Sequence, residues 1–383
     1  MTMLLGHISS IEAYDLLGLG RDSLSQPRGM TPEVRGTIES LALLNTSSLE
    51  QRRSRIARLT ELPLPAHIIV SNRPGLKPSH QVVPHGWSYG QPYSDLASVN
   101  LAAATPYVCP PEMALMQMAR ALTRPKLALL VDQVVGSYRI LRPEAVPFYE
   151  RLSNVGFERA DSSSSNAGAF APTTVYGLPP LSSIETIRSY VAAMPSAWGS
   201  HLLGRSLSLA ADGLASPLEA QVYALAFCGR VNGSAGIPKP LVNSRLEVSG
   251  PAQRLFGSSW IKPDYFWPDA GVAVEATGFL WHGGRQGTAD TSRRMKGYEA
   301  MGIRAMTLTS PEVYDLLVFE GILHQLAGWL GHDIPEETPH FRQRRAWLRS
   351  EVLGIRGTRV QLSPEDDDAW LDALLASYDA TGA

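Results

Sequence analysis

Residues 263–278 read PDYFWPDAGVAVEATG, and this stretch decides which fold we expect for the chain. Within it, residues 272–277 form an apolar strand that contains one carboxylate, Glu275. Side chains alternate between the two faces of a strand, so Glu275 and Thr277 share one face. Burying a lone carboxylate costs several kcal/mol. We therefore expect Glu275 either to face solvent or to have a cationic partner, which could be an arginine or a metal ion.

A second carboxylate, Asp264, opens the strand that precedes Glu275. The intervening residues 267–271, WPDAG, are typical of a turn and predict a hairpin. Antiparallel pairing would bring Asp264 and Glu275 to the same end of the two strands. Two hard oxygen donors placed together favour Mg²⁺, and a metal held there can polarise a phosphate and activate a water molecule. The alternative is that Asp264 is only a turn residue before a strand.

The elements around this hairpin mix helices and strands, which predicts a mixed α/β domain. They are expected, in chain order, as a helix at 216–227, strands at 241–248, 261–267 and 272–277, a helix at 289–301, a strand at 303–308 and a helix at 310–330. The first helix begins with Ser216-Pro217-Leu218-Glu219. This is the pattern of a capping box, with Ser216 at the N-cap and Glu219 at the third helical position.

The order of these residues resembles the PD-(D/E)XK nuclease superfamily, and more narrowly its very-short-patch-repair-like endonuclease branch. The likeness covers about residues 214–330 and is carried by Pro263-Asp264, Val274-Glu275-Ala276-Thr277-Gly278, His282, Asp290-Thr291-Ser292-Arg293, Gly302-Ile303-Arg304 and Thr307. It implies a restriction-endonuclease-like mixed sheet flanked by helices. It also implies a hydrolase, an endonuclease that cleaves phosphodiester bonds in DNA with Mg²⁺ or Mn²⁺.

The resemblance also implies roles for individual residues. Asp264 and Glu275 would bind the metal ion, and Glu219 would be a further acidic ligand in addition to its capping role. Thr277 stands where the superfamily has lysine or, in this branch, aspartate; it can hydrogen-bond a water molecule but supplies no charge. The alternative function is a catalytically impaired protein that keeps the nuclease fold and acts as a nucleic-acid-binding or defence (toxin–antitoxin) regulatory protein.

Further candidate residues follow the strand. We expect His282 either to contact a phosphate or act as an acid–base group, or to be structural. Arg293, Arg294 and Lys296 lie on the expected helix and could follow the backbone of a nucleic acid. The alternatives are a solvated helix face and, for Arg293, a surface ion pair with Asp290 three residues earlier.

The chain is expected to contain more than this one domain. Residues 1–160 are expected to form a mainly helical α+β domain, and residues 161–199 a linker and connecting helix that begins with the polar run DSSSSNAG. The nuclease-like domain is expected at 200–332 and a helical tail at 333–383.

The N-terminal half carries a second resemblance. Segments 65–70, PAHIIV, and 108–119, VCPPEMALMQMA, are similar to the region that precedes such nuclease domains in bacterial proteins related to abortive-infection antitoxins. A third possibility for the function is a purely structural role in a defence complex, in which the N-terminal half would be the docking surface for a protein partner. Some relatives begin with a winged helix, and residues 31–62 could be its remnant.

The composition of the 383-residue chain is typical of a globular protein, with 44% hydrophobic and 18% charged residues and a formal net charge of -2. A nucleic-acid-binding face would therefore be local. The two cysteines, Cys109 and Cys228, are far apart, which favours a reducing compartment and no zinc site. We find no signal-peptide pattern and no apolar run of about 18 residues. We therefore expect a cytoplasmic protein that is not associated with membranes.

Overall fold

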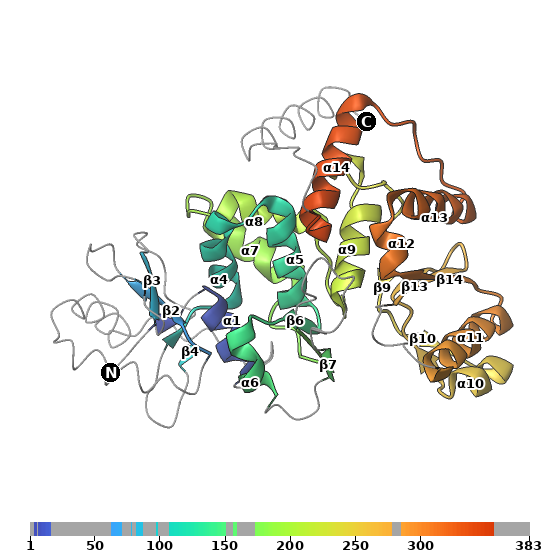
Figure 1. The fold of residues 1–383 in the computed structure, drawn as a ribbon, viewed down its shortest axis with the longest axis horizontal. Coiled ribbons are helices and arrows are strands. Elements are labelled where there is room, and N and C mark those ends of the chain that lie inside the picture. The colour runs from blue at the N-terminus through green and yellow to red at the C-terminus, as the bar shows by residue number, and fades with distance from the viewer. Residues whose placement is uncertain are drawn as a thin grey trace. The chain divides into compact units, whose positions relative to one another are not determined.

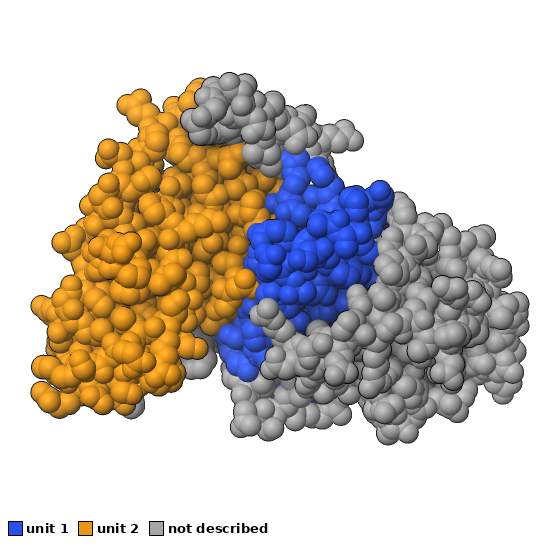
Figure 2. Space-filling view, turned by 180° about the vertical axis from the view of Figure 1, so that it is seen from behind, with its two compact units in different colours: residues 1–122, 133–205 blue, residues 123–132, 206–383 orange. Residues whose placement is uncertain are grey.

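The computed structural model describes residues 4–5, 7–16, 63–70, 78, 82–86, 97–98, 107–150, 156–158, 173–277 and 285–355. The chain divides into two compact units (Figure 2): unit 1 is Met1–Leu122 with Gln133–Arg205, and unit 2 is Thr123–Asp132 with Ser206–Ala383. Both units contain helices and strands (Figure 1), which confirms the general α/β class. No helix among the described residues is long and apolar enough to cross a membrane.

The described residues of unit 1 form two small sheets and short helices. Its strands are β1 (Leu4–Leu5), β2 (Ala66–Val70), β3 (Val82–Gly86), β4 (Ala97–Ser98), β5 (Tyr107–Val108), β6 (Tyr138–Ile140), β7 (Gly156–Glu158) and β8 (Thr174–Tyr176). They pair in the orders β3-β2-β1-β5-β4 and β6-β8-β7. The helices are α1 (His7–Leu16), α4 (Pro111–Met118), α6 (Val146–Tyr149), α7 (Ile184–Ala193) and α8 (Ser200–Ser206), with 3₁₀ turns η5 (Ala119–Ala121) and η6 (Pro143–Ala145). Helix α5 (Arg124–Val135) is divided between the two units.

Helix α1 is buried although it carries acidic side chains. Asp15 accepts two hydrogen bonds from the Arg139 guanidinium, at 3.0 and 3.1 Å, and one from the Tyr149 hydroxyl at 2.8 Å. Glu12 accepts two from Arg142, at 2.6 and 2.7 Å. Buried charges persist when they are both paired and hydrogen-bonded. These two ion pairs therefore hold α1 to strand β6 and to the segment that follows it.

Unit 2 contains residues 214–330, for which a nuclease-like domain is expected. Its helices are α9 (Pro217–Ala226), α10 (Gly250–Phe256), α11 (Arg285–Ala300), α12 (Ser310–Tyr314), α13 (Leu316–Trp329) and α14 (Pro339–Leu353), with 3₁₀ turns η7 (Leu207–Leu209) and η8 (Arg230–Asn232). Its strands are β9 (Leu241–Val242), β10 (Leu246–Glu247), β11 (Trp260–Ile261), β12 (Tyr265–Trp267), β13 (Val272–Thr277) and β14 (Arg304–Thr309). Strands β14, β13, β12 and β9 form a sheet in that order, and β10 and β11 form a separate ribbon.

The predicted hairpin forms the centre of the four-stranded sheet. Strands β12 and β13 are antiparallel, with Tyr265 opposite Val274. Between them Gly271 donates a backbone hydrogen bond to Pro268, and its φ of 58° is one that glycine adopts without strain. Strands β13 and β14 are parallel, which requires a crossover connection, and α11 lies in that connection.

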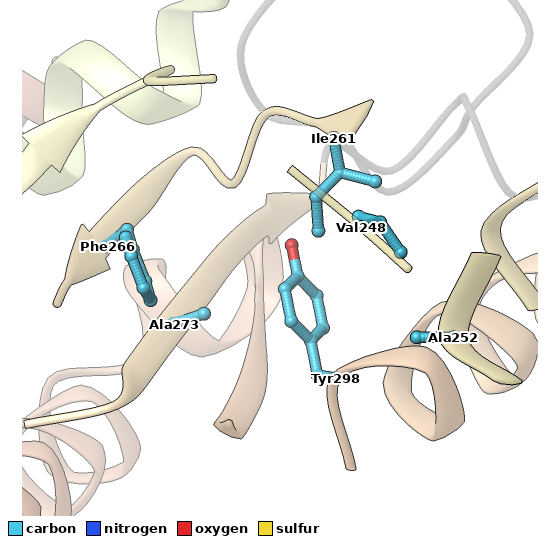
Figure 3. Packing of buried hydrophobic residues seen from close by; sticks show 6 residues of the cluster. All are labelled: Val248, Ala252, Ile261, Phe266, Ala273 and Tyr298. Atoms are coloured by element: carbon cyan, nitrogen blue, oxygen red, sulfur yellow. The ribbon is translucent and has the colours of Figure 1, made fainter. Parts of the chain in front are cut away.

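Helices pack on both faces of this sheet. Tyr265 and Trp267 point to one face and contact Phe227 at the end of α9, with ring centroids 4.9 and 5.4 Å apart. The other face packs against α10 and α11. The core on that face, shown in Figure 3, consists of Val248, Ala252, Ile261, Phe266, Ala273 and Tyr298.

Two of the predicted strands are wrong as single elements. The strand expected at 241–248 is divided into β9 and β10, because Asn243 adopts a left-handed φ of 46° that interrupts the extended backbone. The strand expected at 261–267 is divided into β11 and β12. Pro263 lies at this break, and proline has no N–H group to continue a strand ladder.

The helix expected at 310–330 is also wrong as a single element. It is divided into α12 and α13, because the Asp315 side chain accepts hydrogen bonds from the backbone of Leu317 and Val318, at 3.0 and 3.1 Å, and caps a second helix. Thr309 caps the first helix in a capping box with Glu312. Helix α10 was not predicted.

Some predicted features cannot be placed. The winged-helix remnant expected at 31–62, the polar run at 161–168 and His282 all lie outside the described residues.

Candidate functional site

Asp264 and Glu275 come together at one end of the hairpin. The register pairs Tyr265 with Val274 and Phe266 with Ala273, so the next residues outward, Asp264 and Glu275, lie across from each other on one face. Asp264 accepts a hydrogen bond at Oδ2 from the backbone N–H of Ala276, at 2.7 Å. The side chain of Asp264 is therefore bonded to the strand that carries Glu275.

Glu219 lies in the first turn of α9 and is buried. Its backbone N–H donates to the Ser216 hydroxyl at 3.2 Å, as a capping box predicts. In a capping box the Glu219 carboxylate would also accept a hydrogen bond from the backbone N–H of Ser216. Here it accepts one from the backbone N–H of the preceding residue, Ala215, at 2.9 Å. The Tyr265 hydroxyl donates to the backbone carbonyl of Glu219, which fixes the start of α9 against β12.

Glu275 is buried and has an arginine as its cationic partner. The side chains of Arg294 and Tyr298, one turn apart on α11, both donate to Oε1 of Glu275, and the Arg294 Nε bond is 2.8 Å long. Arg294 also donates from Nη2 to the Lys262 carbonyl at 3.1 Å. Of the alternatives open from the sequence, a solvent-facing Glu275 is wrong, and an arginine partner is present.

The pKa of each of the three carboxyl groups is raised. Burial is the largest cause for all three, and repulsion adds to it, because Glu219 and Glu275 raise the pKa of Asp264 while Glu275 raises that of Glu219. The positive charge of Arg294 lowers the pKa of Asp264 and of Glu275, but by less than burial raises them. The three groups are thus close enough to repel one another. Such a site favours a bound proton or a bound cation.

The donor atoms suit a hard divalent cation held by two carboxylates. Within the described part of the chain, hydrogen bonds reach Oδ2 of Asp264 and Oε1 of Glu275, but none reaches Oδ1 of Asp264 or Oε2 of Glu275. Mg²⁺ is commonly bound by one or two carboxylates and keeps several waters. The same described residues contain no group of three or more His, Cys, Asp or Glu side chains that could hold a metal ion. Asp264 and Glu275 are therefore the two carboxylates that could hold such an ion.

Asn243 is a site residue that the sequence did not reveal. Its amide donates to Oε2 of Glu219 at 2.6 Å and to the Gly213 carbonyl at 3.1 Å, while its backbone N–H donates to the Asp264 carbonyl at 3.1 Å. It therefore connects two of the three acids. The sequence contains only a weak signal for it, an asparagine inside an expected strand. Asparagine is depleted in strands, and it tolerates a left-handed backbone better than most residues do.

The remaining predicted residues lie at the border of this site. Thr277 is half-buried at the end of β13, opposite Thr309 of β14. Arg293 forms the predicted surface ion pair with Asp290, and both side chains are exposed. Lys296 is exposed on α11. Arg294 alone among these cations contacts a site carboxylate, which was not predicted.

Neither protein-family models, curated proteins nor solved structures gave a match to the chain.

The carboxylates should make stability depend on pH. A raised pKa means that the native state binds a proton more tightly than the unfolded chain, so stability falls as pH rises through the raised pKa of Asp264. Asp264→Asn keeps an acceptor for Ala276 but carries no charge. We expect it to melt higher than the wild type at pH 8, by about 2–4 °C for each kcal/mol of repulsion relieved. The difference should shrink towards pH 4, as thermal melts across this range would measure.

The control for this prediction is Asp269→Asn, in the exposed turn of the same hairpin. It should leave the pH profile unchanged. If Asp264→Asn lowers the melting temperature equally at every pH, the carboxyl group has a purely structural role.

Proposed function

We propose that unit 2 carries a restriction-endonuclease-like domain that hydrolyses phosphodiester bonds in DNA with Mg²⁺ or Mn²⁺. The observation that carries this proposal is the convergence of the buried Glu219 and Glu275 with the half-buried Asp264, three carboxylates whose pKa values are all raised. Strongly perturbed pKa values cluster at functional sites, which supports a functional role for these carboxylates. The mixed sheet, with a hairpin followed by a helix and a parallel strand, is consistent with the resemblance on which the proposal also rests.

Each residue has a role in the proposed reaction. Asp264 and Glu275 would hold the divalent ion, which supplies Lewis acidity and lowers the pKa of a bound water. Glu219, whose Oε2 is already bonded to Asn243 and Ala215, would accept a hydrogen bond from a water in this site. Thr277 would orient the attacking water through its hydroxyl.

Arg294 would supply the positive charge that Thr277 lacks. Its guanidinium reaches Glu275, and its side chain is 36% exposed, so part of it remains open to a ligand. Arginine suits phosphate because its planar group presents several donors at once. On this proposal the cation that assists cleavage comes from α11, and not from the position two residues after Glu275.

A second candidate function is favoured by a specific observation. Oε1 of Glu275 is already occupied by Arg294 and Tyr298, which is how a buried carboxylate is satisfied without a metal. The protein would then keep the nuclease fold and act as a nucleic-acid-binding regulator. A calorimetric titration separates the two functions. DNA binding with no heat from Mg²⁺ or Mn²⁺ at millimolar concentration would favour the regulator.

The proposed function is tested by nicking of supercoiled plasmid DNA in Mg²⁺, in Mn²⁺ and in EDTA. Nicking should require the divalent ion. Thr277→Lys should increase the initial rate, by about tenfold or more, because a lysine there adds charge stabilisation close to the metal. Thr277→Val, of similar size but without a hydroxyl, should nick more slowly than the wild type. Equal rates for all three proteins would contradict the role given to this position.

A further inference from the structure

An exposed tryptophan lies on the ribbon formed by β10 and β11. In β11, Ile261 points into the core, and Trp260, its neighbour on the alternate face, is 40% exposed. Two cations lie over the ring in cation–π contacts: the Arg245 guanidinium carbon is 5.2 Å from its centroid, and the Lys262 ammonium is 6.0 Å away. Arg245 also pairs with Glu247 at 2.8 Å. The surface therefore combines a partly exposed aromatic ring with two long, flexible cationic side chains.

Hydrogen bonds of Arg294 connect the segment that carries Trp260 to the carboxylate site. Lys262 is separated from Asp264 by one residue, Pro263. Arg294 donates to the Lys262 carbonyl through Nη2 and to Glu275 through Nε, so one side chain joins the segment that carries Trp260 to the acidic site. Trp260 and Asp264 are four positions apart in the sequence, so the tryptophan and the carboxylate site belong to one continuous segment of the chain.

We propose that Trp260, with Arg245 and Lys262, is a stacking platform for an unpaired base, so that the substrate of the neighbouring site is a single-stranded segment of DNA. This inference rests on the proposed nuclease function for the identity of the ligand. An aromatic face stacks any base, and a base that stacks on Trp260 would displace the cations from the ring towards the adjacent phosphates. Bases in an intact duplex are covered by their neighbours, so the platform selects unpaired nucleotides.

The test is binding of fluorescently labelled DNA in EDTA, where no hydrolysis takes place, measured by fluorescence anisotropy. The probes are a single strand of about 16 nucleotides, which is as long as the largest site of a single-strand-binding OB fold, and the duplex of the same sequence. Trp260→Ala should weaken single-strand binding by about 5–150-fold, the equivalent of about 1–3 kcal/mol for one stacked base. Trp260→Phe, which keeps an aromatic face, should bind within about threefold of the wild type.

Trp198 provides a matched control. It belongs to unit 1, it is also 40% exposed, and the Arg120 guanidinium carbon lies 5.7 Å from its ring. Trp198→Ala should bind the single strand as the wild type does. If Trp198→Ala weakens binding as much as Trp260→Ala, or if Trp260→Ala binds the single strand normally, the inference is overturned. An equal loss for strand and duplex would also overturn it, because stacking on an unpaired base would not explain the loss.

Failure of this inference can be distinguished from failure of the proposed function. If the protein nicks DNA with Mg²⁺ while Trp260→Ala binds and nicks like the wild type, the nuclease stands and the platform does not. If Trp260→Ala lowers single-strand binding but no preparation nicks DNA with any divalent ion, hydrolysis fails and the surface remains a site for single strands.

Discussion

Glu275→Gln should reduce divalent-dependent nicking by about 10²–10³-fold, the scale expected when a group that stabilises charge in the transition state is lost. Glutamine keeps an oxygen that can accept the hydrogen bonds of Arg294 and Tyr298, so the packing around the site should survive. It removes the negative charge that a metal ion requires. It also removes repulsion from Asp264 and Glu219, so the variant should be at least as stable as the wild type at pH 8.

This combination of lost activity and retained stability distinguishes a ligand from a structural residue. Glu299→Gln is the matched control, because it makes the same substitution at an exposed position of α11. It should nick at the wild-type rate. Initial rates in Mg²⁺ and thermal melts of the three proteins make the comparison. Undiminished nicking by Glu275→Gln would show that Glu275 does not bind the metal.

Arg139→Met should lower the free energy of unfolding of unit 1 by about 3–5 kcal/mol, the cost of removing one partner from a buried ion pair. The side chains of Arg139 and Asp15 are 4% and 0% exposed. Without the guanidinium, Asp15 keeps, among the described residues, the hydrogen bond from Tyr149. Several backbone carbonyls, among them that of Tyr138, also lose a donor. Methionine fills much of the volume, so the loss reflects charge and hydrogen bonding more than an empty cavity.

The effect of Arg139→Met should depend on pH. Burial already raises the pKa of Asp15, and Arg139 lowers it, so the substitution should raise that pKa further. A protonated Asp15 tolerates burial, and the variant should therefore approach the wild type as pH falls. Arg188→Ala breaks the exposed pair with Glu185, whose side chains are 58% and 75% exposed, and should cost less than about 1 kcal/mol. Urea unfolding of the full chain measures both. Equal losses would contradict the structural role given to Arg139.

The hairpin could be predicted from the sequence because its signals are local. Alternation in residues 272–277 and the turn WPDAG determine strand, face and pairing, and the structure has them where expected. Alternation also required a cation for a buried Glu275. It could not identify Arg294, because that residue lies 19 positions away along the chain on another element, and no periodicity links the two.

The buried acids of α1 could not be predicted for a similar reason. Its sequence, HISSIEAYDL, places two carboxylates on a short helix, a pattern usually found at a surface. The partners of Asp15 and Glu12 lie 124 and 130 residues away. Hydrophobic patterning predicts which residues are buried, but it does not predict which charged residues form ion pairs in the folded chain. Asn243 escaped prediction because its role also depends on contacts that form only when the chain is folded.

The hydrogen bonds of Asn243 have a consequence for the choice of ion. Asn243 bonds both to the Glu219 carboxylate and to the backbone of Asp264, so it restrains the start of α9 relative to the segment that carries Asp264. On the proposed function, an ion held by Asp264 and Glu275 would find Glu219, and the water that it binds, held in place. Mg²⁺ demands short, nearly octahedral bonds, whereas Ca²⁺ accepts longer and more variable ones. Asn243 would then help the site to discriminate between ions of different radius. Asn243→Gly should reduce the preference for Mg²⁺ over Ca²⁺, which nicking rates in the two ions would measure.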